Sequence, residues 1–252
     1  EEAFNTYGHF DSTNHTLTLN ANLPVESNVF RIVACTKNYP LLNSLSWDEI
    51  DNLSSRGFAP YLFNIGDTKQ LLIGEDQIRR VRIIDFNKDV LATSRKGDSQ
   101  YANITFEFTG LVGNDYWNNH NGINSKNHNF IEDSNLHDVL APNGYIYKRL
   151  PNELMIHTKQ VIKRVKIFQD NQWIDASYTT QLFPLSFEEI AGENEIYSYY
   201  KNGGSRKKDD SYWLRTPNQG SNKQIYEVDH RGIIYDVNSV YSQNGIAPGF
   251  CI

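Results

Sequence analysis

The apolar residues of this 252-residue chain recur mostly with the two-residue period of a strand, and in short segments. Ile104, Phe106 and Phe108 alternate with polar residues, as in a strand with one face in solvent. Residues 71–73 and 78–86 predict a hairpin across a four-residue turn. Further strands are expected at residues 161–168, 212–215, 225–229, 233–237 and 245–252. The pattern therefore predicts a domain that is based on sheets.

Helix signals are brief and lie between these strands. Two capping boxes, Ser46 with Glu49 and Ser186 with Glu189, each begin a helix that soon reaches a glycine. Two more short helices are expected, at residues 134–140 and from Pro151 to about residue 157. Because strands outnumber helices and the helices are short, the sequence predicts an α+β fold with twisted antiparallel sheets.

The chain is expected to consist of a β-rich lead-in or junction, residues 1–45, and one domain, residues 46–252. Within the lead-in, residues 15–19 alternate as a strand does, and residues 29–36 predict a second strand. Residues 114–129 are rich in asparagine and have no periodicity, so they predict a polar loop.

Charge and hydropathy exclude two classes of partner. The formal net charge is −6 and the pI is about 5.6, whereas nucleic-acid-binding domains usually present a basic face. Basic residues at 79–82 and 159–166 alternate with apolar ones, which is typical of a strand with one solvated face. No apolar run approaches the roughly 20 residues of a membrane-spanning helix. We expect neither a nucleic-acid partner nor membrane insertion.

Common catalytic motifs are missing from the sequence: it has no glycine-rich phosphate loop, no His-Glu-x-x-His and no Gly-x-Ser-x-Gly. We therefore expect no catalytic residues, no cofactor and no metal. Two metal sites stay open as alternatives, His120 and His128 with Asp115 or Glu132, and calcium at Asp209 and Asp210 or in residues 114–133, although neither has the spacing of a known metal motif.

The two cysteines, Cys35 and Cys251, allow two interpretations. They could form a disulfide that joins the two ends of the chain, or they could be buried free thiols, the more common state of such cysteines. The chain begins at Glu1 and its single methionine is Met155, so we expect an initiator, and a signal or an upstream domain, to have been removed. Together with the many asparagines, this favours an extracellular protein.

The strands near the C-terminus carry many tyrosine, asparagine and serine side chains. Tyrosine offers rigid contact area with a polar tip, and asparagine and serine offer adaptable hydrogen bonds, which is the chemistry of recognition surfaces. A tyrosine-rich sheet face with ordinary loops is the alternative interpretation.

This region also carries a family resemblance. The motif Trp-Leu-Arg-Thr-Pro at residues 213–217, the hairpin with Val228 and Gly232, and the ending Gly-Ile-Ala-Pro-Gly-Phe-Cys-Ile resemble the DUF6273 family of gut Firmicutes and their phages. Segments at residues 46–50, 63–69, 185–190 and 199–203 resemble that family too. The resemblance covers about residues 46–252.

The ending of that family is similar to C-type-lectin-like folds, which formylglycine-generating enzymes and phage adhesins share. The resemblance implies that Trp213 packs in the core and that Arg215 binds a buried carboxylate or backbone carbonyls. It places a binding face between Trp213 and Asn244. The residues it assigns to ligand contact are Tyr226, Asp229, His230, Tyr235, Asn238, Tyr241 and Asn244, flanked by Tyr116 and Trp117.

The leading hypothesis is a non-catalytic recognition module on a bacterial cell surface or a virion, with a glycan or a protein as its ligand. A calcium-dependent lectin is not expected, since the sequence has no Glu-Pro-Asn or Gln-Pro-Asp. One alternative is a structural module of a larger surface or phage-tail protein. The other is an oxidase similar to formylglycine-generating enzymes, which would need Cys251 as an exposed, reactive thiol.

Overall fold

The computed structural model describes residues 8–11, 16–19, 41–94, 99–118, 130–169, 171–221 and 223–252. The chain divides into two compact units, residues 1–39 and residues 40–252. In the first unit, β1 (Gly8–Asp11) and β2 (Thr16–Leu19) form an antiparallel pair. β2 confirms the strand expected at residues 15–19, whereas the strand expected at residues 29–36 lies outside the described residues.

The larger unit has the α+β class that the sequence predicts. One five-stranded antiparallel sheet has the order β3-β4-β5-β14-β9. Its strands are β3 (Thr68–Ile73), β4 (Gln77–Phe86), β5 (Ile104–Phe108), β9 (Leu182–Phe183) and β14 (Gly249–Cys251). The β3–β4 hairpin confirms the expected turn, and the C-terminal strand β14 lies between β5 and β9.

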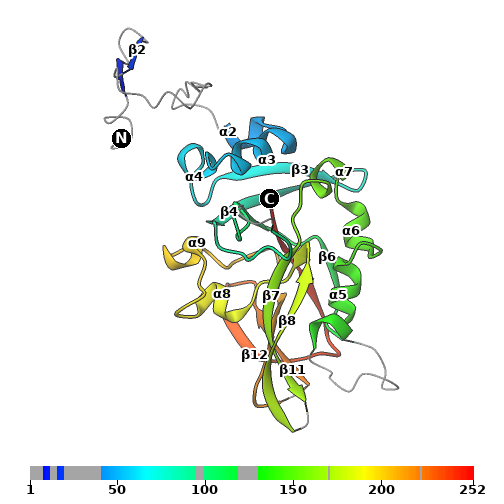
Figure 1. Ribbon diagram of the computed structural model, residues 1–252. Coiled ribbons are helices and arrows are strands. Elements are labelled where there is room, and N and C mark those ends of the chain that lie inside the picture. Colours follow the sequence, from blue (N-terminus) through cyan, green and yellow to red (C-terminus); the bar gives the residue numbers. More distant parts are fainter. Residues whose placement is uncertain are drawn as a thin grey trace. The chain divides into compact units, whose positions relative to one another are not determined.

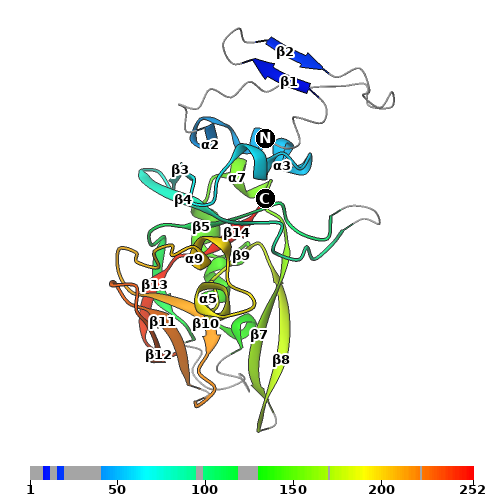
Figure 2. The same ribbon diagram turned by 90° about the vertical axis from the view of Figure 1, so that its left-hand side faces the viewer.

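A second five-stranded sheet, which we call the outer sheet, has the order β12-β11-β10-β13-β6. Its strands are β6 (Gly113–Tyr116), β10 (Tyr212–Pro217), β11 (Gln224–Val228), β12 (Ile234–Ser239) and β13 (Gln243–Ile246). Only the β10–β13 pair is parallel. A separate hairpin joins β7 (Val161–Gln169) and β8 (Gln172–Thr180), and Figure 2 shows it on the other side of β10 from β11 and β12.

Short helices surround the sheets. They are α2 (Leu41–Ser44), α3 (Trp47–Ser55), α4 (Ala59–Leu62), the 3-10 helix η1 (Ile131–Asp133), α5 (Asn135–Leu140), α6 (Tyr145–Arg149), α7 (Asn152–Met155), α8 (Phe187–Ala191) and α9 (Ser198–Lys201). Figure 1 shows α2, α3 and α4 beside β3, with α5 and α6 on the opposite side from α8 and α9. None of the described helices is both long and apolar enough to cross a membrane.

The core of the larger unit is aromatic where α3 meets the first sheet. The ring of Trp47 meets the rings of Phe106 and Phe250 edge-on, with centroids 5.6 and 5.9 Å away. Phe106 and Phe250 stack on each other at 5.2 Å across β5 and β14. Because these residues come from three distant segments, helix α3 and the last strand are fixed to the same sheet.

Both predicted capping boxes are present. Ser46 and Ser186 each accept the backbone N–H of the glutamate three residues later, and each glutamate accepts the backbone N–H of its serine. We expect Ser46→Ala to lower the free energy of unfolding by about 1 kcal/mol, because the N–H of Glu49 loses its partner. Urea denaturation measures this loss. Ser55→Ala at the other end of α3 is the control, and equal effects of the two variants would contradict a capping role.

Three predictions from the sequence patterns are wrong in the structure. Thr105 and Glu107 of β5 are buried as completely as their apolar neighbours, because α9 and the segment that follows it cover the face expected to be in solvent. Arg82 and Lys163 belong to buried ion networks instead of the solvated faces expected for residues 79–82 and 159–166. Residues 113–116 form strand β6, not a loop, because they pair with the edge of β13.

The helices differ from the prediction mainly in number. Ser134 caps α5, which confirms the helix expected at residues 134–140. Pro151 is the N-cap of α7 and not its first helical residue. Among the described helices, α2, α4, α6, α9 and η1 were not expected, since three to five residues are too few to show a helical period.

Candidate functional site

The residues predicted to contact a ligand lie on the outer sheet, but they do not share one face. The Tyr226 ring packs on Phe187 of α8, with ring centroids 5.1 Å apart. Glu227 follows it in β11, and successive strand side chains point to opposite faces. Tyr226 is therefore half-buried toward α8, which corrects the expectation that it joins the other predicted residues on one platform.

A carboxylate and two amides meet on the face that carries Glu227. Asn238 of β12 and Asn244 of β13 each donate a side-chain hydrogen bond to Glu227 Oε2, both at 2.5 Å. Asn244 is buried, and its Oδ1 accepts its neighbour's backbone N–H, so it supports the cluster from beneath. Glu227 was missed by sequence reasoning, which singled out tyrosine and asparagine alone.

The turn between β11 and β12 is fixed by Asp229. Its Oδ1 accepts the backbone N–H groups of Arg231 and Ile233 at 2.8 and 2.9 Å, and its Oδ2 accepts Arg231 Nε at 2.8 Å. Arg231 donates a second hydrogen bond to the Tyr235 hydroxyl at 2.7 Å. The almost buried Asp229 thus holds the turn, while Tyr235 is exposed and His230 points into solvent without joining this network.

The remaining predicted residues, Tyr241, Tyr116 and Trp117, also differ in how exposed they are. Tyr241 is exposed on the turn between β12 and β13. Tyr116 is half-buried at the end of β6, opposite Gln243. Trp117 is fully buried and donates Nε1–H to the Leu214 carbonyl at 3.1 Å, so it cannot flank a ligand; this prediction is wrong because the ring fills the core beneath the outer sheet.

Four side chains remain together at the surface: Glu227, Arg231, Tyr235 and Asn238. Glu227 and Tyr235 are paired across β11 and β12, and paired residues of an antiparallel sheet share a face. Arg231 binds Tyr235, and Asn238 binds Glu227. We call these four residues the hairpin surface.

A buried ion network connects the outer sheet to α8. Arg215 of β10 binds Glu189 of α8 with two hydrogen bonds of 2.6 Å, and also binds the Pro184 carbonyl at 2.8 Å. Arg215 therefore binds both a carboxylate and backbone carbonyls, as expected, and Trp213 beside it is buried, also as expected. Burial raises the pKa of Glu189, but the Arg215 and Lys163 cations outweigh it and lower that pKa to about 2.

The same network continues through Lys163. Its Nζ donates to Asp89 Oδ1, to Glu189 Oε1 at 3.0 Å and to the Tyr197 hydroxyl at 2.7 Å. Thr105 donates to the other Asp89 oxygen at 2.5 Å. Two carboxylates and two cations therefore balance each other, and we call Asp89, Lys163, Glu189, Tyr197 and Arg215 the lysine cluster.

A second buried network surrounds Glu107. Its carboxylate accepts Arg82 Nε at 2.7 Å, Lys208 Nζ at 2.8 Å and the Tyr200 hydroxyl at 2.7 and 2.8 Å. The Arg82 guanidinium also lies 4.0 Å over the Tyr199 ring. Burial raises the pKa of Glu107, but Lys208 and Arg82 outweigh burial and the pKa is lowered. Here one carboxylate compensates two cations.

The comparison with protein families decides where the chain belongs. The model of a domain of unknown function, DUF6273, matches residues 87–252. The chain belongs to the DUF6273 family. The match begins later than the resemblance at residues 46–252, and it contains the outer sheet and the whole lysine cluster. No curated protein and no solved structure matches the chain.

Cys251 of the DUF6273 domain is a buried free thiol. Burial raises its pKa well above the usual value, and the carboxylate of Asp89, 3.4 Å from the sulfur, raises it further. A thiolate is disfavoured there, so the environment does not favour a reactive cysteine. Cys35, the other member of the proposed disulfide, lies outside the described residues.

We expect Cys251 to react with a thiol reagent only when the domain unfolds. Its reaction rate in native protein should be at least tenfold below that in guanidinium chloride, because the thiol is inaccessible and protonated. A Cys35→Ser variant restricts the measurement to Cys251. Fast reaction of native Cys35→Ser protein would contradict this environment and would favour the oxidase hypothesis.

A cavity of about 260 Å³ lies by the β3–β4 hairpin, lined by Gln70, Ile78, Arg79, Arg80, Thr109, Gly110 and Asp209. The predicted ligand contacts do not line it.

Among the residues that the structure describes, no three His, Cys, Asp or Glu side chains are grouped so that they could hold a metal. His120 and His128 lie outside that part of the chain.

Proposed function

We propose that this DUF6273 domain is a non-catalytic recognition module that binds a glycan through the hairpin surface, with a protein ligand as the alternative. The observation that carries the proposal is the arrangement of two hydrogen-bonded pairs, Glu227 with Asn238 and Arg231 with Tyr235, which the strand register places beside one another. Carboxylate and amide groups bind sugar hydroxyls, and an exposed tyrosine ring offers a flat apolar contact.

Preorganisation supports this proposal. Asp229 fixes the turn beneath Arg231, and Asn244 of β13, on the far side of β10, donates a hydrogen bond to Glu227. Ligand binding would therefore cost little ordering of side chains, which favours affinity. Glu227 Oε1 and Asn238 Oδ1 have no hydrogen bond to any described residue, so both can accept one from a ligand.

The proposal includes a C-type-lectin-like relationship and display on a bacterial cell surface or a virion. The late tryptophan strand β10 and the terminal strand β14 enclose the β11–β12 hairpin in sequence, which supports the likeness to such folds. It remains a fold-level analogy, and the ligand follows from the hairpin surface alone.

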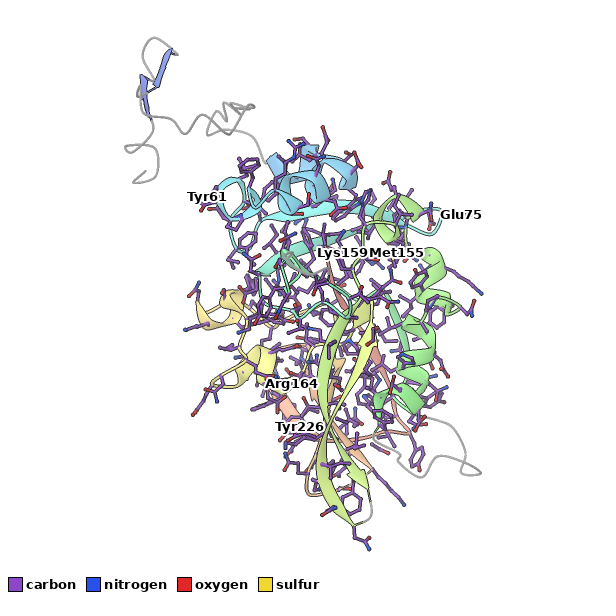
Figure 3. All side chains as sticks on the ribbon, in the orientation of Figure 1. Tyr61, Glu75, Met155, Lys159, Arg164 and Tyr226 are labelled. Carbon is purple, nitrogen blue, oxygen red and sulfur yellow. The ribbon has the colours of Figure 1, made fainter. Side chains whose placement is uncertain are left out.

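A glycan array, with purified bacterial surface proteins printed beside the sugars, tests the proposal. We expect Tyr235→Ala with Asn238→Ala to weaken binding to the identified ligand at least tenfold, because the ring contact and an amide are lost. Tyr61→Ala is the matched control, since Tyr61 is 83% exposed on α4, far from the hairpin surface (Figure 3).

Thermal unfolding of the same variants separates binding from folding. The melting temperature should change little, since Tyr235 is exposed and Asn238 half-exposed. Binding to a protein spot would replace the glycan by a protein. Unchanged binding by the double variant would remove the hairpin surface from the proposal, and silent arrays with a stable oligomer would favour the structural module.

A further inference from the structure

Lys163 and Asp89 form a close, dry pair in the centre of the domain. The side chains are 2% and 7% exposed. Lys163 Nζ contacts Asp89 Oδ1 directly, and it lies 3.6 Å from the centre of the Phe183 ring, so an aromatic wall closes one side. The pair joins the start of β7 to the segment after β4, which are far apart in sequence.

We propose that Lys163 and Asp89 condense to an amide, which joins Nζ to Cγ and forms a permanent cross-link inside the domain. The new bond is N–C, and the bond that breaks is one C–O bond of the carboxylate. An ammonium and a carboxylate together contain the atoms of one amide and one water molecule, so no other reactant is consumed. The two protons that leave nitrogen depart with the carboxylate oxygen as water.

Neighbouring groups provide a path for these protons. Asp89 Oδ1 contacts Lys163 Nζ directly and can take the proton that must leave before nitrogen attacks, which places a neutral amine beside a carboxylic acid. The Tyr197 hydroxyl lies 3.2 Å from Glu189 Oε1 and 2.9 and 3.1 Å from the two Asp89 oxygens. Tyr197 therefore donates a hydrogen bond to the Asp89 carboxyl group, where negative charge develops when nitrogen attacks.

Burial favours the product over the ion pair. Contact between two fixed reacting groups replaces a bimolecular encounter, which is a large advantage for bond formation. The amide is neutral, whereas the pair it replaces has two desolvated charges. The same burial keeps bulk water away from the product, so hydrolysis is hindered.

The second buried lysine provides an internal comparison. Lys208 Nζ contacts Glu107 Oε2 at 2.8 Å and the Phe108 carbonyl at 2.6 Å. Two cations compensate the Glu107 carboxylate, so it does not take up the proton that would have to leave Lys208. Because Arg82 also binds the Glu107 carboxylate, we expect Lys208 and Glu107 to remain an ion pair.

Intact mass spectrometry of the denatured full chain tests the cross-link. We expect the wild-type mass to be lower than the sequence mass by one water molecule, and a peptide map to show the segment around Asp89 joined to the segment around Lys163. The map is essential because loss of water elsewhere in the chain would give the same mass. Lys163→Arg should have no joined peptide, whereas Lys208→Arg should keep it.

The wild-type result decides the proposal even if a variant fails to fold. A peptide map with residues 89 and 163 in separate, unmodified peptides would overturn it and leave a buried ion pair. Joined peptides at Lys208 and Glu107 instead would overturn the assignment of the cross-link to Lys163 and Asp89. On a denaturing gel, the joined chain should migrate faster than Lys163→Arg, since its unfolded form contains a closed loop.

Discussion

Replacing Glu107 by glutamine is expected to lower the free energy of unfolding by about 3–5 kcal/mol. Glutamine keeps the shape of the side chain but removes the charge that compensates Arg82 and Lys208. Both the Glu107 and the Lys208 side chains are fully buried, so water cannot replace the lost partner. Urea denaturation monitored by tryptophan fluorescence measures the change.

Glu75→Gln is the matched control. Glu75 lies in the exposed turn between β3 and β4, where the same chemical change should alter stability by less than about 0.5 kcal/mol (Figure 3). A Glu107→Gln variant as stable as Glu75→Gln would show that Arg82 and Lys208 do not depend on the carboxylate.

Acid should remove the stability that Glu189 contributes. Arg215 and Lys163 outweigh burial and lower the pKa of Glu189 from 4.5 to about 2. A carboxylate with a lowered pKa stabilises the folded state above the pKa of the unfolded chain, and the contribution is lost as the pH falls through the folded-state pKa. The loss therefore falls between about pH 4.5 and pH 2, and it amounts to a few kcal/mol.

The comparison of wild type with Glu189→Gln isolates this group. The difference in the free energy of unfolding should be largest above pH 5, and it should become smaller as the pH falls toward 2, because only the wild type gains the proton. Denaturant titrations at several pH values give both curves. A difference that stays constant with pH would mean that Glu189 has the same pKa in the folded and the unfolded chain, and would contradict the strong Arg215 pairing.

Glu189 illustrates how local and tertiary roles overlap. Its spacing from Ser186 predicts a capping box, and that box is present. The same carboxylate also binds Arg215 and Lys163, both from strands distant in sequence. A capping role explains the residue completely at the level of the sequence, so nothing in the sequence indicates the second role.

The candidate site shows the same limit. Residues of β11 and β12 were correctly expected to be a hairpin, yet Tyr226 packs on α8 and Trp117 fills the core. Residue type predicts that a tyrosine or an asparagine can bind a ligand. It does not predict whether a helix covers that face of the strand.

The sequence by itself determined what depends on neighbours along the chain: the hairpin turns, the capping boxes, the α+β class and the motifs of the DUF6273 family. The tertiary structure decided which alternate residues of each strand are buried. A two-residue period defines two faces, but the elements that cover them come from distant segments. For that reason Glu107, Arg82 and Lys163, which alternate with apolar residues as solvent-facing residues do, became the charged interior of the domain.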